Sequence, residues 1–256
     1  MERHGLSFPC KRDFRDLVRI RFGLPLSGLP AKCACGKKFS LDHSQVCLVG
    51  GFIHMRHDNI RDLFLSLCSS AYNDVQGEPP LIPLSGEVLR AKSANLADDA
   101  RADARVRSFW RRGQNAFFDF KVFYPYAKSY VDKKLSTVFK QLQMAKSREY
   151  EQRVVEVDGG SFTPMVMSSL GSCGQRMSVA LQALALKLAS KHNDEYAHVM
   201  GLLRCRFAFV CMRSTLICLR GSRPLTRKRS LALREALIDS VSSPAALVLE
   251  EIRLDH

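Results

Sequence analysis

Apolar residues recur at helical spacing in several segments of the chain. Phe14, Leu17, Val18 and Phe22 lie on one face of a helix over residues 11–22, which Gly23 and Pro25 end. The same period predicts four further helices. The first runs to Ala71, with Asp58 or Asn59 as its N-cap. The others are residues 130–150, a segment through Met177 and Leu188, and a long segment from Tyr196 to Gly221. The chain is therefore expected to be rich in amphipathic helices.

Other segments have the pattern of β-strands. Residues 101–109 alternate between small or apolar residues and charged ones, which is typical of a half-buried strand. Residues 116–124 are apolar almost throughout and predict a central strand. Shorter strands are predicted at 75–82, 153–157 and 161–168, the last at a sheet edge because it contains Pro164. From residue 56 the order helix, strand, strand, strand, helix, strand predicts a mixed α/β fold with helices packed on a sheet.

The composition narrows the class of protein. A length of 256 residues with 46% hydrophobic and 25% charged residues fits an ordinary globular chain. Lys and Arg number 39 against 25 Asp and Glu, and the net charge of +14 favours a polyanionic partner, nucleic acid ahead of a membrane surface. The sequence has neither the run of roughly 18 apolar residues that spans a bilayer nor a signal-peptide type of start, so we expect an intracellular protein without membrane contact.

Four side chains with zinc-ligand chemistry fall within one short segment. Cys33, Cys35, His43 and Cys47 are spaced as C-x-C-x7-H-x3-C, and Gly36 permits a tight turn after the first pair. His43 and Cys47 are four residues apart, a spacing that aims both at one point on a helical turn. Tetrahedral thiolate and imidazole ligation suits Zn²⁺ in a reducing compartment. The spacing alone leaves open whether His54 or His57 replaces one ligand.

A second set combines carboxylates with a lysine. Asp103 on one predicted strand and Asp119 on the next can converge on Mg²⁺, with Glu78 on the preceding short strand as a further ligand. Lys121 shares a face with Asp119 and can stabilise charge at a reacting phosphate or help to deprotonate water. Taken by themselves, Asp119 and Lys121 also fit a simple cross-strand pair. Burying two charges in a Phe-rich strand is costly unless something binds them.

The ordered motifs resemble the restriction-like endonuclease region that follows the reverse transcriptase in site-specific non-LTR retrotransposons. The resemblance rests on CACGKKFSLDHSQVC, the RHDNI segment that starts at Arg56 and His57, Glu78-Pro79, ARADARV, FFDFKV, and Lys146 with Tyr150. It covers about residues 33–150 and extends to Arg223 only in general character. Ala102 stands where the family usually has proline before the first aspartate, and proline supplies backbone shape but no ligand.

This resemblance implies a PD-(D/E)XK nuclease fold that nicks target DNA to prime reverse transcription. Asp103 and Asp119 match the residues that bind the catalytic Mg²⁺, Lys121 matches the motif lysine, and Lys146 and Tyr150 match an auxiliary pair near the phosphate. The zinc knuckle and neighbouring basic residues, Arg56 and His57 among them, would engage DNA and also element RNA. Arg105, Arg107, Arg111 and Arg112 are the basic residues nearest to Phe109 and Trp110 and could track a nucleic-acid backbone.

The expected organisation has four parts: an N-terminal helical segment at 1–31, a zinc knuckle at 32–50, a restriction-endonuclease-like core at 51–175, and a helical C-terminal extension at 176–256 with a basic linker. Arg227, Lys228 and Arg229 resemble a nuclear-localisation cluster, so the nucleus is the expected compartment. No polymerase motif is present, so a reverse transcriptase is expected as a separate partner or as part of a parent polyprotein. Two alternatives to a nuclease remain: a nucleic-acid-binding remnant without turnover, and a zinc-stabilised protein-interaction domain.

Overall fold

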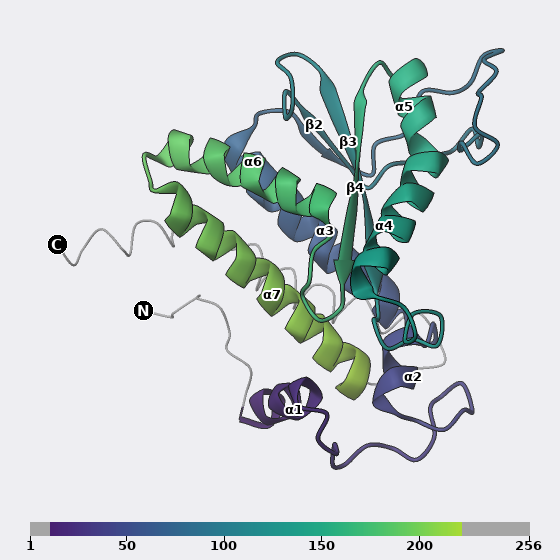
Figure 1. Ribbon diagram of the computed structural model, residues 1–256, viewed down its shortest axis with the longest axis vertical. Helices are drawn as coiled ribbons and strands as arrows, with labels where there is room; N and C mark the ends of the chain where they lie inside the picture. The colour runs from purple at the N-terminus through teal and green to yellow at the C-terminus, as the bar shows by residue number, and fades with distance from the viewer. Residues whose placement is uncertain (1–10, 222–256) are drawn as a thin grey trace. The chain divides into compact units, whose positions relative to one another are not determined.

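A computed structural model of the chain describes residues 11–221 and forms a mixed α/β structure (Figure 1). The described chain divides into two compact units, the first built from residues 11–59 and 209–221 and the second from residues 60–208. Helices α3 and α7 each supply residues to both units. The motif-based boundaries at 31/32, 50/51 and 175/176 stay a prediction, and the Arg227–Arg229 cluster lies outside the described residues.

Most of the helices lie where the sequence predicts them. They are α1 Lys11–Arg21, α2 Leu41–Val46, α3 Phe52–Ala71, α4 Leu135–Lys146, α5 Gln152–Glu156, α6 Gln175–His192 and α7 Tyr196–Arg220, with a π-helical turn, η1, at Ser147–Glu151. The predicted start of α3 is wrong, because Asp58 and Asn59 lie inside the helix. Gly50 and Gly51 have φ of 91° and 72°, a left-handed conformation that suits glycine, and α3 begins directly after them.

The second unit is built on one four-stranded sheet with the order β1-β2-β3-β4. Its strands are β1 Val75–Gly77, β2 Ala104–Arg107, β3 Asn115–Phe123 and β4 Ser161–Ser168. The first three pair antiparallel, and β4 pairs parallel with β3. The predictions of a central strand at β3 and an edge strand containing Pro164 at β4 are confirmed.

The strand predicted over residues 153–157 is wrong, since these residues continue the helix through η1 and α5. Arg153 is fully buried, and its guanidinium donates hydrogen bonds to the backbone carbonyls of Ile82, Asn95 and Ala97. Val154 packs in the same core cluster as Tyr150, four residues earlier, which places both on one helical face. These tertiary contacts override the β-propensity of the two valines.

Each face of the sheet is covered by helices. The Phe64 ring of α3 packs against Phe118 and Phe120 of β3, with ring centroids 4.9 and 5.5 Å away. On the opposite face, Phe139 of α4 packs against Phe123, and Tyr150 stacks on Phe162 of β4. Because side chains alternate along a strand, the odd-numbered residues of β3, Asp119 and Lys121 included, lie on the face covered by α4 and η1.

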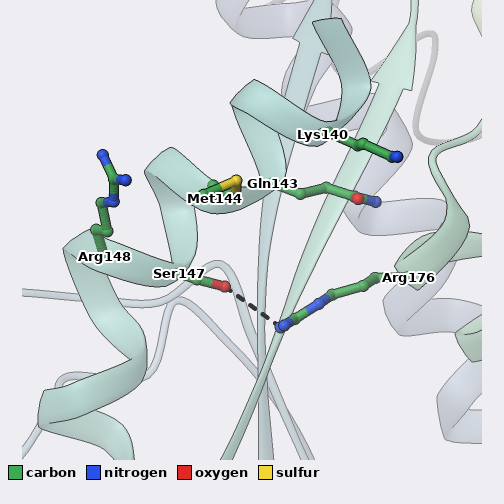
Figure 2. Close-up of a pocket in the computed structure, with 6 residues that line it drawn as sticks. All are labelled: Lys140, Gln143, Met144, Ser147, Arg148 and Arg176. Carbon is green, nitrogen blue, oxygen red and sulfur yellow. Dashed lines mark hydrogen bonds between the residues drawn. The ribbon is translucent and has the colours of Figure 1, made fainter. Parts of the chain in front are cut away.

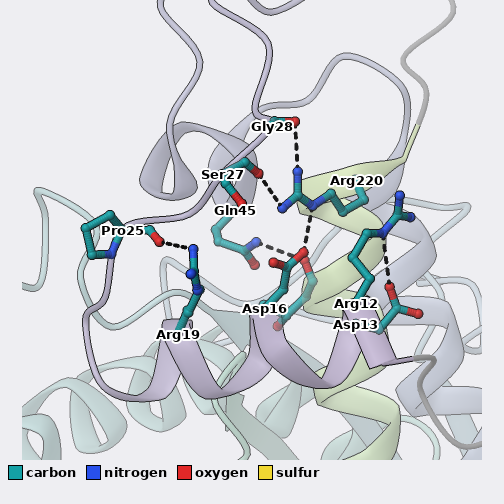
Figure 3. A network of polar contacts seen from close by, with 10 residues as sticks. Arg12, Asp13, Asp16, Arg19, Pro25, Ser27, Gly28, Gln45 and Arg220 are labelled. Carbon is teal, nitrogen blue, oxygen red and sulfur yellow. Dashed lines mark hydrogen bonds and ion pairs between the residues drawn. The ribbon is translucent and has the colours of Figure 1, made fainter.

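The first unit is held together by a buried ion pair between segments far apart in sequence (Figure 3). The Nε of Arg220 donates to Oδ2 of Asp16 at 2.8 Å, and its two Nη atoms donate to the backbone carbonyls of Ser27 and Gly28. Asp16 is fully buried, whereas Phe14 is 64% exposed. Helix α1 therefore forms as predicted but buries a charged residue in place of the aromatic one on its apolar stripe.

Candidate functional site

The predicted zinc ligands come from a short hairpin and the helix that follows it. Backbone pairing between Lys32 and Lys38 and a left-handed Gly36 fold the Cys33–Cys35 segment into a tight turn. The hydroxyl of Ser40 accepts a hydrogen bond from the His43 backbone N–H and caps α2. Local sequence therefore fixes both halves of the site.

All four ligand atoms, from Cys33, Cys35, His43 and Cys47, lie within 4.8 Å of one another. The Cys33 and Cys47 Sγ atoms are 3.7 Å apart, and Cys35 Sγ lies 3.3 Å from His43 Nε2. Four ligands at zinc–sulfur distances of about 2.3 Å on a tetrahedron would have sulfur atoms ~3.8 Å apart. The cluster could therefore hold a metal such as zinc with little rearrangement.

The surroundings of the thiols differ. A backbone hydrogen bond at Lys37 lowers the pKa of Cys35, whereas burial raises the pKa of Cys47. A bound cation would favour the thiolate form of both. The histidine of the Cys/His cluster is His43, and neither His54 nor His57 belongs to the cluster. His57 Nδ1 lies 3.5 Å from Asp58 Oδ1.

The two predicted catalytic aspartates are placed by neighbouring backbone segments. Asp103 immediately precedes β2, and its backbone N–H donates to the carbonyl of Phe118 on β3. Its Oδ2 accepts a hydrogen bond at 2.5 Å from the backbone N–H of Phe120. The Asp103 carboxylate therefore leans against β3 beside Asp119, although it comes from the adjacent segment.

Asp119 is buried and lies among other charged side chains. Burial, followed by the negative charge of Asp103, raises the pKa of Asp119 to about 7. Its Oδ2 forms an ion pair with Lys146 Nζ at 3.1 Å, and no other partner for this oxygen is found among the described residues. Burial works against the charge of Lys146, but the carboxylates of Asp119 and Glu149 raise the pKa of its ammonium group.

The π-helical turn brings two more groups to this cluster. Glu149 Oε2 lies 3.2 Å from Lys146 Nζ, and the Tyr150 ring centroid lies 5.1 Å from it. Burial, and then the charge of Asp119, raises the pKa of Tyr150 to about 12, so the phenol stays protonated at neutral pH. Sequence reasoning found Lys146 and Tyr150 but missed Glu149. Its three-residue spacing from Lys146 is the signal that could have found it.

Among the described residues, Lys121 and Glu78 form no ion pair with Asp119 or Lys146. Lys121 follows Asp119 on the same face of β3, is exposed, and forms no ion pair with the described residues. Glu78 follows β1, and its carboxylate accepts from Arg61 Nη1 at 2.5 Å. Within residues 11–221 the Cys/His cluster is the one group of three or more metal-ligand side chains that converges. Asp103 and Asp119 are a pair, and the Mg²⁺ role remains a proposal.

The basic residues predicted to bind nucleic acid fall into two sets. Arg56 is 2% exposed and donates to Gln45, and Arg105 Nη2 forms a 2.7 Å ion pair with Asp74, so their contacts are internal. In contrast, Arg107, Arg111 and Arg112 are exposed around the turn between β2 and β3. There the Trp110 indole N–H donates to Thr163 Oγ1, which fixes a partly exposed aromatic ring among three cations.

None of the helices within the described residues is long and apolar enough to cross a membrane. Neither a scan against protein-family models nor a search of curated proteins finds a match to the chain.

Proposed function

We propose that the chain is a metal-dependent DNA endonuclease with a restriction-endonuclease-like core, which nicks target DNA during retrotransposon integration. The observation that carries the proposal is the pairing of Asp103 and Asp119, two carboxylates from adjacent segments whose charges interact. The order α3, β1, β2, β3, α4, β4 around a mixed sheet also fits a core of this type.

The chemistry of the carboxylate pair suits Mg²⁺. This ion is usually held by one or two carboxylates together with waters and substrate phosphates, so Asp103 and Asp119 would suffice as its protein ligands. When bound, the metal would lower the pKa of a coordinated water and so supply the nucleophile. Glu78 stays a candidate third ligand that would first have to leave Arg61.

The lysines have different roles in this proposal. Lys121 is exposed beside Asp119, and its ammonium would stabilise the charge that develops on the attacked phosphate. Lys146 holds the Asp119 carboxylate in place from α4, and the Tyr150 ring supports Lys146 from the next turn. These two residues position the carboxylate, and the charge of Lys146 opposes the rise in the pKa of Asp119 that burial causes.

The partner is proposed to be DNA, with element RNA as a further ligand and a reverse transcriptase as a partner or parent chain in the nucleus. A charge of +14 supports a polyanionic ligand. The exposed Arg107, Arg111 and Arg112 beside Trp110 fit backbone contacts with base stacking, and the zinc hairpin adds the exposed Lys37 and Lys38.

The decisive experiment is a nicking assay on supercoiled plasmid with Mg²⁺ or Mn²⁺. Lys121→Ala should lower the nicking rate by about 100-fold or more, because a transition-state charge contact is lost, while DNA affinity stays within a few-fold of the parent. Lys128→Ala removes another exposed lysine, in the segment after β3, and should nick like the parent. Equal nicking by the parent and Lys121→Ala would contradict the proposed role.

A second candidate is a nucleic-acid-binding protein without turnover. The observation that favours it is the Lys146 ammonium, which already neutralises Asp119 without any metal. This candidate predicts salt-sensitive DNA binding by the parent with no nicking in either metal. A chain that neither nicks nor binds DNA at about 0.15 M salt would instead fit a zinc-stabilised protein-interaction domain.

A further inference from the structure

A small hollow on the second unit is lined by cationic and polar side chains outside the carboxylate cluster. It has a volume of about 290 Å³, and its walls are Lys140, Gln143, Met144, Ser147, Arg148 and Arg176. Figure 2 shows Lys140 and Gln143 reaching from α4 toward the side of Arg176, which comes from α6, whereas Arg148 lies on the other side of the helix and points away from them. This volume is at the lower limit of ligand pockets and suits a small anionic group.

The hollow is electrostatically suited to an anion. Three of its six lining residues carry positive charge, and none carries negative charge. Glu151, outside the lining, lies 3.5 Å from Arg176 Nη1, but both side chains are more than a third exposed, so this pair is weak. A second hollow of about 370 Å³, which shares Ser147 and Arg148 with the first, has Glu151 and Glu156 in its wall and is therefore less suited to an anion.

The polar groups of the hollow are also prearranged. Arg176 Nη1 donates to Ser147 Oγ at 3.3 Å, which joins α6 to the π-helical turn across the hollow. With the Gln143 amide turned so that its oxygen faces α6, this oxygen accepts from the backbone N–H groups of Gln175 and Arg176 and caps α6, whose N-cap Gly174 has no side chain to do so. The cations are thus mounted on two helices that are tied to each other.

The position of the hollow connects it to the proposed cleavage site. Lys140, Gln143 and Ser147 recur at helical spacing on one face of α4 and η1, and Lys146 on the same helix pairs with Asp119. A nucleic-acid strand that meets Asp119 beside this helix can therefore place a neighbouring phosphate in the hollow. Arginine and lysine at a hydroxyl-lined pocket are typical phosphate ligands.

We propose that this hollow binds one backbone phosphate of the DNA duplex that the protein nicks. The inference rests on the proposed function for its ligand, but it concerns binding and needs no turnover. Lys140 and Arg176 provide the charge, Ser147 a neutral hydrogen-bond donor, and Arg148 a cation at the rim. The contact would hold the strand in register and carry no sequence preference of its own.

The test is the affinity of the full chain for a labelled DNA duplex, measured by fluorescence anisotropy over a series of salt concentrations. The double variant Lys140→Gln with Arg176→Gln should lose one phosphate contact, which lowers the slope of log affinity against log salt by about 0.9 and the affinity by about fivefold at about 0.15 M salt. The matched control, Lys187→Gln with Lys191→Gln, removes two exposed charges nearer the other end of α6 and should change the slope much less. Equal thermal melting of both double variants excludes misfolding.

Several results would overturn the inference. An unchanged slope in the Lys140/Arg176 variant, or an equal change in the control, means that the hollow makes no specific phosphate contact. A loss confined to single-stranded RNA assigns the hollow to RNA. Binding of inorganic phosphate by the parent chain in calorimetry, at constant ionic strength and with no change in DNA affinity between parent and variant, assigns it to a small phosphate ligand. If the parent binds duplex and the Lys140/Arg176 variant shows the expected change in slope, but the parent does not nick, the nuclease proposal fails and the phosphate site stands.

Discussion

The Cys/His cluster and the carboxylate cluster are both charged candidate metal sites, but they are assembled differently. The first takes all four ligands from 15 consecutive residues and brings their ligand atoms within 4.8 Å of one another. The second takes Asp103, Asp119 and Lys146 from three separate segments, and the Lys146 ammonium pairs with the buried Asp119 carboxylate. The comparison shows that a metal-binding geometry can be encoded locally, whereas the carboxylate cluster depends on the sheet and its crossover helix.

The largest effect is expected from the removal of one of the four predicted zinc ligands. Cys47→Ser should abolish zinc binding, because a four-ligand site with three remaining ligands loses much of a binding free energy of about 10–16 kcal/mol. Native mass spectrometry should show the single zinc ion of the parent lost in the variant. Cys205→Ser, at an exposed cysteine outside the cluster, is the control and should keep its zinc. A parent that is folded and free of zinc would contradict the assignment.

A second change tests whether the first unit also depends on a long-range contact. Arg220→Ala leaves Asp16 buried without its ion-pair partner and should lower the free energy of unfolding by about 3 kcal/mol, measured by urea denaturation. Arg19→Ala removes another arginine of the same network (Figure 3), whose contact is one exposed hydrogen bond to Pro25, and should cost less than about 1 kcal/mol. Similar losses in the two variants would show that Asp16 does not depend on Arg220.

The smallest expected effect is in the second unit and depends on pH. Because the pKa of Asp119 is raised to about 7 in the folded protein, folding favours its protonated form, and its contribution to stability is lost as pH rises through about 7. Asp119→Asn cannot ionise there. Without added Mg²⁺, its stability relative to the parent should therefore increase by about 2 kcal/mol between about pH 5.5 and about pH 8.

Urea unfolding at several pH values measures this difference. Asp98→Asn, at an exposed loop carboxylate, is the control and should follow the parent throughout. A flat difference for Asp119→Asn would mean that the carboxylate remains ionised across this range, with Lys146 outweighing its burial.

The sequence predicts the local parts of this molecule well. The zinc ligands share one hairpin and one helical turn, so their spacing alone brings them together. The alternation of Ala104, Arg105 and Val106 predicts a half-buried strand, and the apolar run around Phe118 predicts the central strand. Burial alternates along β2 and is continuous through the middle of β3. Both patterns can be recognised from the local sequence without knowledge of distant partners.

What the sequence does not predict depends on tertiary contacts. The two valines at 154 and 155 favour a strand. The buried Arg153 keeps these residues helical, because its guanidinium is hydrogen-bonded to backbone carbonyls of the loop at 82–97. The internal pairing of Arg105 with Asp74, 31 residues away, also has no local signal. The family resemblance implies Lys146 near the phosphate, but its pairing with Asp119 likewise has no local signal.

The π-helical turn at Ser147–Glu151 has a consequence for how this chain tolerates length changes. A π turn accommodates one residue more than an α-helical turn of the same rise, so deleting one residue here would restore a regular helix. Side chains beyond the deletion would keep their direction relative to α4, because the wider turn had absorbed the extra residue. A one-residue deletion within α4 itself would instead rotate every later side chain of the helix by about 100°, turning Lys146 from Asp119 and Arg153 from the carbonyls it binds. The turn is therefore the part of this helix that best tolerates the loss of one residue.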